Sequence, residues 1–422
     1  YQKGQPVLAK RPSLITRLRM FAKRYWHFLT IGTISGIFVT FLALILYNQS
    51  RKEQPYWQLV CEEDFADSVL DDQWTVSSSP GQWTISNGAL RADGAGASFV
   101  RLNRTFTRDI RIEFDIAADR WELANAGLFV YGDMPDSSYC FHLFHGGEAR
   151  SGITYPGSSF LIFEHDPLTH PLGTNFHVVV ERKNNMISYT VNDVRIAEIW
   201  DLFPYLGPGH QKIGFFVNGW PGRFDNLKIY QMAVPQLPGP AMIANRFWER
   251  GEFSAALEEY SPLLSTSRRS EDRDAILLRM SDCLLRTGGF QRADSLLTQV
   301  LSSPSASEDQ KATAQYLKGI RLELQGDMAA SRLAFAEVNA RYPLHPANES
   351  AFISMLLAAA DSVSSGRHAS ADEAAVALAK TYSRQHLPLV ARIHESVLLQ
   401  MLKKGRRSEE HTSELQSQFH LV

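Results

Sequence analysis

Cysteine is scarce in this sequence, which has only Cys61, Cys140 and Cys283 among its 422 residues and no CxxC pair. So few cysteines exclude a disulfide scaffold, and the lack of a CxxC pair argues against a zinc ribbon. A bridge between Cys61 and Cys140 stays open, as does the alternative that both are buried free thiols. We expect folded regions that rely on hydrophobic cores and hold neither a cofactor nor a metal.

Charged side chains are absent from residues 28–47, which read FLTIGTISGIFVTFLALILY. A helix of this length measures ~30 Å at a rise of ~1.5 Å per residue, about the hydrocarbon thickness of a bilayer. We expect a single transmembrane helix here, after a juxtamembrane segment at residues 1–27 and before a linker at residues 48–55. A cleaved signal peptide is the rival interpretation, but its apolar region would be shorter and small residues would mark a cleavage site.

Acidic residues are absent from the first 28 positions, which carry seven Lys and Arg side chains. Because such side chains resist translocation, we expect the N-terminus in the cytoplasm and the residues after position 50 outside it. The basic segment adjoins a membrane and has few aromatic residues, so its expected partner is membrane lipid and not nucleic acid. Gly32 and Gly36 form a GxxxG pattern, which permits close helix contact and predicts a homodimer through the span.

Kinase motifs are also absent: the chain has no glycine-rich loop, HRD or DFG, so we do not expect it to be an enzyme as given. Its basic run GQPVLAKRPSLITRLRMFAKRYW nevertheless resembles the juxtamembrane segment of large bacterial membrane-bound Ser/Thr protein kinases. In that family the segment joins a kinase domain to one span and an external sensor. The resemblance implies a single-pass protein of the bacterial inner membrane and a kinase domain upstream of a chain that begins without Met. An ordinary basic stop at the inner face of a membrane is the open alternative.

Residues 56–233 are rich in aromatic, glycine and β-branched residues and contain frequent turn signals. Asn87-Gly88 predicts a type I′ hairpin, because both turn positions need a positive φ. In DIRIEFDIA, Ile110, Ile112 and Phe114 alternate with charged residues, which predicts a strand with one buried and one wet face. We expect an antiparallel two-sheet sandwich of roughly a dozen strands.

Several pieces of this region together resemble the concanavalin A-like lectin/glucanase superfamily, an all-β jelly-roll sandwich. They are EEDFADSVLDDQW, WTISNGAL, IRIEFDI, VNDVRIAEI and GRFDNLKIY. Laminarinase-type relatives cleave glycans with an ExDxxE strand, in which two carboxylates flank the scissile bond. Glu113 and Asp115 take the first two places, but Ala118 takes the third, so we expect recognition of a glycan without catalysis. A membrane-anchored glycoside hydrolase is the alternative.

A glycan site would need aromatic platforms beside polar groups. Aromatic residues at predicted strand ends or loops, with one histidine of the pair His142 and His145, supply the candidates. We expect the ligand to contact Trp121, His145, Tyr155 and Trp220, with Trp200 as a further aromatic candidate. A second histidine pair, His165 and His170, lies near Asp166, but surface and capping roles are commoner for such residues than a metal site.

Residues 234–240, VPQLPGP, are a proline-rich linker, after which Ala, Leu, Arg, Glu and Ser recur at helical spacing. A repeat is visible in residues 241–405, where a bulky residue follows each glycine by two positions and a small residue by five. The glycines are Gly251, Gly288, Gly326 and Gly366. The pattern resembles tetratricopeptide repeats and implies an all-α helical-repeat solenoid. Such a solenoid would either bind a protein or peptide on its concave face or simply support the sandwich.

Residues 406–422 include RSEEHTSELQS, which resembles a sequencing adapter translated in frame, so we expect an artefactual tail. The order predicted for the whole chain is a single transmembrane helix, an all-β jelly-roll sandwich and an all-α helical-repeat solenoid. The predicted function is non-catalytic recognition of an external ligand such as a glycan, as the sensor half of a transmembrane kinase. A purely structural envelope scaffold is a further alternative.

Overall fold

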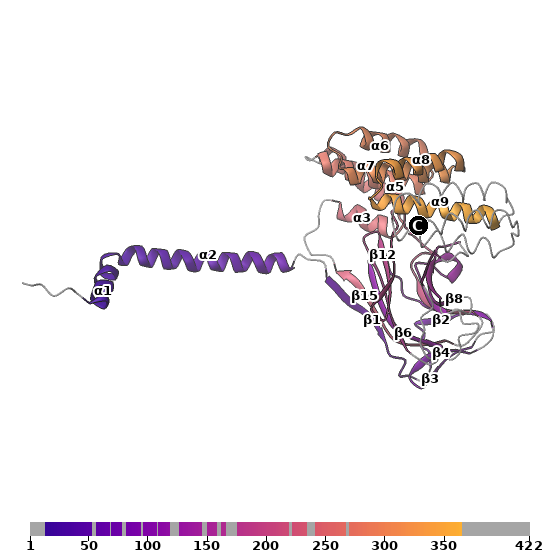
Figure 1. Ribbon diagram of the computed structural model, residues 1–422, viewed down its shortest axis with the longest axis horizontal. Helices are drawn as coiled ribbons and strands as arrows, with labels where there is room; N and C mark the ends of the chain where they lie inside the picture. The colour runs from indigo at the N-terminus through magenta and orange to yellow at the C-terminus, as the bar shows by residue number, and fades with distance from the viewer. Residues whose placement is uncertain are drawn as a thin grey trace, which may run out of the picture. The chain divides into compact units, whose positions relative to one another are not determined.

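The structure is a computed structural model, and it describes residues 13–52, 56–67, 69–77, 82–93, 96–107, 109–118, 126–145, 150–157, 162–165, 175–218, 222–233, 241–266 and 270–364. The chain divides into two compact units. One holds the N-terminal helices, and the other holds a β-sandwich together with a helical region (Figure 1). The predicted repeat at Gly366 and the predicted tail lie outside the described residues.

The N-terminal unit contains α1 (Leu14–Arg24) and α2 (Trp26–Lys52). Large apolar side chains of α2 are exposed, among them Ile34, Ile37 and Phe38. The sequence predicts a membrane span at residues 28–47, whereas no helix among the described residues is both long and apolar enough to cross a membrane. The structure does not describe the side chains of residues 28–29 and 46–47, at the two ends of the predicted span.

The sandwich consists of two antiparallel sheets, as the alternating strands of the sequence predict. The eight-stranded sheet runs in the order β13 (Val194–Trp200), β12 (Met186–Val191), β11 (Phe176–Lys183), β6 (Ile110–Ala118), β15 (Gly222–Ala233), β4 (Ala89–Asp93) and β3 (Gln82–Ser86), with β1 (Tyr56–Glu63) also paired to β15. The seven-stranded sheet runs in the order β10 (Ile162–His165), β9 (Arg150–Thr154), β8 (Tyr139–His145), β7 (Ala126–Val130), β14 (Ile213–Asn218), β5 (Ala97–Leu102) and β2 (Trp74–Val76). A short 3₁₀ helix, η1 (Pro135–Ser137), precedes β8.

The core between the sheets is aromatic. Phe215 of the seven-stranded sheet stacks on Phe224 of the other sheet, with ring centroids 4.4 Å apart. Phe114 of β6 lies 5.2 Å from Phe215, so the predicted buried face of β6 contributes directly to this cluster. The predicted hairpin is confirmed by Asn87 and Gly88, whose φ values of 56° and 68° are those of a type I′ turn.

The cysteines are free thiols. Cys140 and Cys283 are buried, and Cys61 is partly buried. Of the two alternatives that the sequence left open, the structure therefore shows free thiols at Cys61 and Cys140. Burial raises the pKa of both thiols, to about 12 for Cys140, which is typical of inert cysteines in an apolar core.

The helical region contains α3 (Met242–Glu249), α4 (Phe253–Thr266), α5 (Ser270–Arg286), α6 (Phe290–Ser302), α7 (Glu308–Leu324), α8 (Met328–Arg341) and α9 (Pro346–Ser364). The predicted turn glycines Gly251, Gly288 and Gly326 each join two helices with φ between 77° and 82°. The small residues five positions later are Ala256, Ala293 and Ser331, all at most 1% exposed. The predicted helix-pair repeat is thus confirmed for the described residues.

The helical region and the sandwich share one hydrophobic core. A single cluster of buried residues extends from the sandwich, through Ile199 of β13, to helix residues such as Leu284 and Ile353. The first helices of successive pairs contact one another, α5 with α7 and α7 with α9, and α9 also contacts β13. The sequence left open whether the solenoid binds a protein or peptide on its concave face or simply supports the sandwich. The face formed by these first helices lies against the sandwich in part.

Candidate ligand pocket

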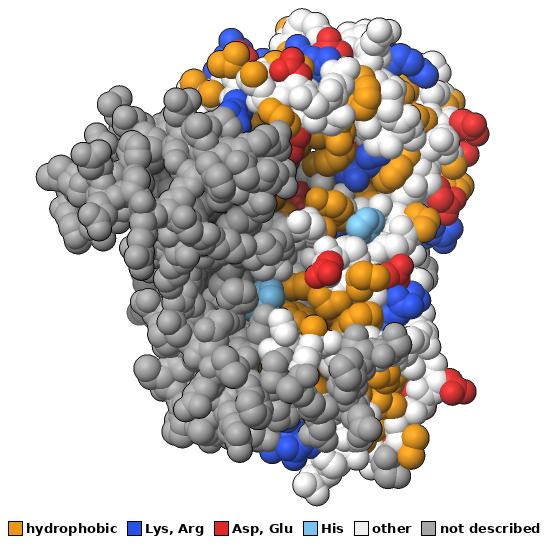
Figure 2. Space-filling view, turned by 90° about the vertical axis from the view of Figure 1, so that its right-hand side faces the viewer, with side chains coloured by type: hydrophobic (Ala, Val, Ile, Leu, Met, Phe, Trp, Pro, Cys, Tyr) orange, Lys and Arg blue, Asp and Glu red, His pale blue; other side chains and the backbone are white. Residues whose placement is uncertain are grey.

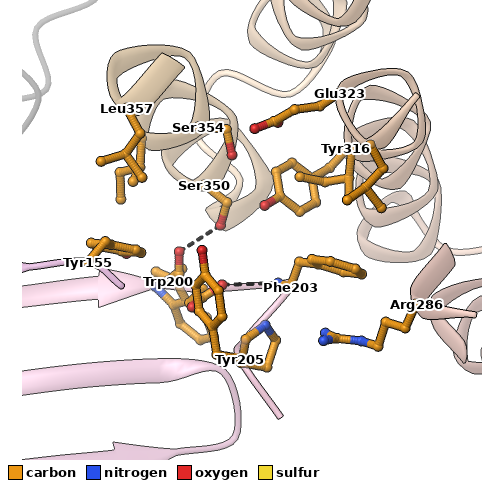
Figure 3. A pocket seen from close by; sticks show the side chains of 15 residues that line it. Tyr155, Trp200, Phe203, Tyr205, Arg286, Tyr316, Glu323, Ser350, Ser354 and Leu357 are labelled. Carbon is orange, nitrogen blue, oxygen red and sulfur yellow. Dashed lines mark hydrogen bonds between the residues drawn. The ribbon is translucent and has the colours of Figure 1, made fainter. Parts of the chain in front are cut away.

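A pocket of about 250 Å³ lies between the sandwich and the helices α5, α7 and α9, called the inner helices below. Its sandwich side comes from the end of β9 and from the segment that follows β13, and its helix side from α5, α7 and α9 (Figure 3). The lining residues used below are Tyr155, Trp200, Asp201, Phe203, Tyr205, Arg286, Tyr316, Glu323, Ser350 and Ser354. On the face shown in Figure 2, apolar side chains are exposed in several patches among charged and polar ones.

Two hydrogen bonds fix the end of β13 against α9. The Ser350 hydroxyl donates to the Trp200 carbonyl at 2.6 Å, and the Trp200 N–H donates to Glu349 Oε1 at 3.3 Å. Burial raises the pKa of Glu349 to about 7, and the Trp200 bond opposes this rise. The edge of the sheet is thereby tied to the helix at the rim of the pocket (Figure 3).

The floor of the pocket is organised by Asp201. The hydroxyl of Tyr139 donates to Asp201 Oδ2, and the Phe203 N–H donates to Asp201 Oδ1 at 3.1 Å. Tyr139 Oη also accepts the N–H of Tyr205, at 3.3 Å. Burial raises the pKa of Asp201, and the Tyr139 bond opposes this rise. Both oxygens of Asp201 are therefore engaged in holding the 200–205 segment in place.

Arg286 lies at the C-terminal end of α5. Its Nε donates to Asp282 Oδ1 at 2.5 Å, and its guanidinium carbon lies 3.9 Å from the centre of the Phe203 ring. The side chain is only 10% exposed, and its Nη2 is buried without a hydrogen-bond partner among the described residues. The Nη2 amino group of a largely committed cation is thus available to an acceptor.

Two further polar atoms of the described lining have no hydrogen-bond partner: the Tyr155 hydroxyl and Glu323 Oε2, both buried. Burial raises the pKa of Glu323 from 4.5 to about 7, and no other cause contributes. Leaving a buried donor or acceptor unpaired costs about 1–3 kcal/mol, so such groups are rare and call for an explanation. Here three of them line one pocket.

The sequence placed ligand contacts at four residues, and the structure brings one of them, Tyr155, into the pocket. The further candidate Trp200 lines it as well. Trp121 and Trp220 lie outside the described residues, as does the side chain of His145, whose backbone belongs to β8. His142 is buried, with Nε2 3.1 Å from Thr154 Oγ1. Among the described residues, no cluster of His, Cys, Asp or Glu could hold a metal ion.

The glucanase-like carboxylates lie elsewhere, on the face of β6 that points away from the core. Glu113 accepts from Arg111 Nε at 2.7 Å. Asp115 contacts His177 Nδ1 at 2.9 Å and accepts from Asn226 Nδ2 at 2.7 Å. Each carboxylate is therefore satisfied by neighbours on its own sheet, as structural surface charges usually are.

Sequence reasoning missed the helix side of the pocket. Tyr316, Ile320 and Glu323 are spaced at i, i+4 and i+7 on α7, which is the spacing of one helix face. The signal that could have revealed the site is Glu323 itself, an acidic residue in an otherwise apolar stripe. Arg286 and Ser354 carry no comparable signal. Arg286 is a basic residue in the last turn of α5, and Ser354 is a small polar residue within α9.

The comparisons with known proteins bear on the sandwich. No protein-family model and no curated protein matches the sequence. Among solved structures, the chain is similar to a Bacillus subtilis protein of unknown function with a galectin-like fold, at 12% identity and TM-score 0.36, over 43% of this chain and 100% of that one. It is similar to the carbohydrate binding module CBM66 from Bacillus subtilis, at 15% identity and TM-score 0.28, over 38% and 92%.

A third similar structure is the catalytic domain of a laminarinase from Thermotoga petrophila, at 13% identity and TM-score 0.32, over 42% of this chain and 99% of that one. Because no family model matches, the resemblances to a kinase juxtamembrane segment and to tetratricopeptide repeats stay predictions. The described residues form a two-sheet antiparallel β-sandwich followed by an all-α region.

Proposed function

We propose that this chain is a non-catalytic receptor that binds a small hydroxylated ligand of the carbohydrate type in the pocket between its sandwich and its inner helices. The observation that carries the proposal is the set of three unpartnered polar atoms, on Tyr155, Arg286 and Glu323, around one pocket. A ligand that supplies their hydrogen bonds would offset the cost of burying them.

Aromatic side chains make up much of the remaining wall. The rings of Tyr155, Trp200, Phe203, Tyr205 and Tyr316 all line the pocket (Figure 3). Aromatic surface beside a few fixed polar groups is typical of small-molecule sites, and it suits the apolar face and hydroxyl edge of a sugar ring. The volume of about 250 Å³ is below the usual range of such sites, so a single sugar unit fits the proposal better than a long glycan.

Catalysis is not part of the proposal. Hydrolysis of a glycoside needs one protonated and one ionised carboxyl group across the bond. Glu323, whose pKa is raised to about 7, has the property of a general acid, which favours a hydrolase as the second candidate. Asp201, the other lining carboxyl group, accepts hydrogen bonds at both oxygens, from Tyr139 and Phe203, so it is poorly placed to act as a nucleophile or base.

For the rest of the chain we propose a membrane anchor. The apolar residues 28–47 would hold the protein in a bacterial inner membrane with the basic N-terminus in the cytoplasm, and a Ser/Thr kinase domain would lie upstream. The open surface at Gly32 and Gly36, where a Cβ atom would meet nothing within 4 Å, supports a dimer through this helix. Upstream DNA that lacked HRD and DFG codons in frame would contradict the kinase part.

The binding proposal is tested by isothermal titration of the full chain with monosaccharides. Detergent is needed because α2 exposes apolar side chains. We expect at least one sugar to bind with a Kd in the micromolar to millimolar range, and Tyr155→Phe to weaken it. A panel of neutral, acidic and amino monosaccharides without any binding would refute the proposal. Cleavage of nitrophenyl glycosides that Glu323→Gln abolishes would instead establish the hydrolase.

A further inference from the structure

We infer that the ligand presents a protonated amino group to Glu323, which makes an amino sugar the fitting class. This inference rests on the proposed function and adds the charge of the ligand to it. Glu323 extends from α7 toward the pocket (Figure 3), and its Oε2 atom is buried without a partner. An ammonium group is a strong complement to such an atom, because it donates hydrogen bonds and also balances the negative charge.

Nothing in the described part of the molecule already plays this part for Glu323. Its Oε2 atom has no hydrogen-bond partner among the described residues, and burial raises its pKa to about 7. Arg286, the cation of the described lining, is committed to Asp282 and to the face of Phe203. Within these residues, the cationic complement of Glu323 is therefore missing.

The other titratable groups of the lining include one cation, Arg286, which is paired with Asp282. They are Tyr155, Asp201 and Tyr205 of the sandwich, Arg286 of α5 and Tyr316 of α7, with Glu349 on α9 beside them. Burial raises the pKa of Asp201 and of all three tyrosines, so the tyrosines stay neutral. A bound ammonium group would meet Glu323 as its ion partner and Asp201 as a second negative centre.

The aromatic wall favours the same charge. Tyr205 and Tyr316 both lie close enough to Glu323 for its charge to raise their pKa values further. An ammonium group near such rings gains cation–π attraction, which also favours a cationic ligand over a neutral one. The unpartnered Tyr155 hydroxyl and Arg286 Nη2 remain to bind ring hydroxyl or ring oxygen atoms. A neutral sugar satisfies these two groups but leaves the carboxylate unbalanced.

Matched probes test the inference by isothermal titration of the full chain at pH 7. Glucosamine carries the amino group, glucose carries a hydroxyl in its place, and N-acetylglucosamine carries a neutral amide. We expect glucosamine to bind at least tenfold more tightly than the other two. Because an ammonium group favours ionised Glu323, binding should also release protons, seen as a binding enthalpy that depends on the ionisation enthalpy of the buffer.

Glu323→Gln should abolish both the preference and the proton release while binding of glucose persists. Glu349→Gln is the matched control, because Glu349 has a similarly raised pKa on the neighbouring helix but is bonded to Trp200 and does not line the pocket. Equal affinity for all three sugars would overturn the inference and leave the proposed function standing. Binding of none of them, and of no other monosaccharide, would overturn both.

Discussion

The outer face of the eight-stranded sheet and the pocket differ in whether their carboxylates have hydrogen-bond partners. On the sheet, Glu113 and Asp115 are paired with Arg111, His177 and Asn226. In the pocket, Glu323 has a buried oxygen without a partner. The sequence drew attention to the carboxylates on the sheet, because they resemble part of a hydrolase motif. The contrast is that the carboxylates on the sheet have completed hydrogen bonds, whereas Glu323 keeps an unpaired oxygen in a pocket that two other unpaired polar atoms also line.

The two regions also differ in what holds them together. The outer face belongs to the sandwich alone, whereas the pocket exists only while the helical region is docked. Gly251 makes that docking possible, because a Cβ atom there would overlap Gly207 Cα of the sandwich. Gly288 and Gly326 have the same positive φ, but a Cβ atom added at either glycine would meet nothing within 4 Å.

Gly251→Ala should therefore have the largest effect. We expect a loss of roughly 2–4 kcal/mol in the free energy of unfolding, from backbone strain and overlap together, and loss of sugar binding. Gly288→Ala and Gly326→Ala should lose only about 1–2 kcal/mol, from strain, and keep binding. Urea denaturation followed by circular dichroism measures all three. Equal losses would show that docking does not depend on the Gly251–Gly207 contact.

Tyr139→Phe should have the next largest effect. The change removes the hydrogen bond to Asp201 and leaves a buried carboxyl group and the Tyr205 N–H without this partner. We expect destabilisation by roughly 2–3 kcal/mol, measured by the same denaturation. A variant as stable as the wild type would mean that the floor of the pocket is not organised by Asp201.

The next effect concerns the pH dependence of stability, to which the pocket contributes through Glu323. Because burial raises the pKa of Glu323 to about 7, the folded chain holds a proton that the unfolded chain releases above pH 4.5. This contribution to stability is therefore full below pH 4.5 and declines as the pH rises to about 7. Relative to wild type, Glu323→Gln should gain thermal stability at about pH 8 compared with pH 4.5. A difference that stayed constant with pH would show that Glu323 is not buried as described.

A smaller gain is expected from Tyr155→Phe. Since the Tyr155 hydroxyl is buried without a partner, its removal should raise the free energy of unfolding by about 1 kcal/mol while weakening the binding of the sugar. Thermal unfolding and titration measure the two effects on one sample. Lower stability in the variant would reveal an internal partner for the hydroxyl and remove it from the proposed site.

The outer face should respond least. Glu113→Gln and Asp115→Asn replace charges that are paired near solvent, where one pair contributes about 0.2–1 kcal/mol. We expect changes within that range and an unchanged sugar affinity. A large loss of binding in either variant would return the site to the sheet and restore the hydrolase-like interpretation.

The sandwich and the helix pairs could be predicted because local patterns determine them. Alternation placed Ile112 and Phe114 in the core, and the repeat placed Gly251, Gly288 and Gly326 in turns of positive φ. The pocket could be predicted only at Tyr155 and Trp200, because much of its other half comes from helices that follow far later in the chain. No local pattern indicates that the inner helices lie against the end of β13, since that contact depends on the docking of two regions.

Hydrogen–deuterium exchange of the full chain, with and without a saturating monosaccharide, compares the pocket with the outer face in one experiment. We expect slower exchange in peptides that cover residues 200–205 and 316–324, since a ligand there would tie the sandwich to α7. Peptides that cover residues 110–118 should not change. Protection confined to residues 110–118, with the pocket unaffected, would contradict the placement of the ligand between the sandwich and the helices.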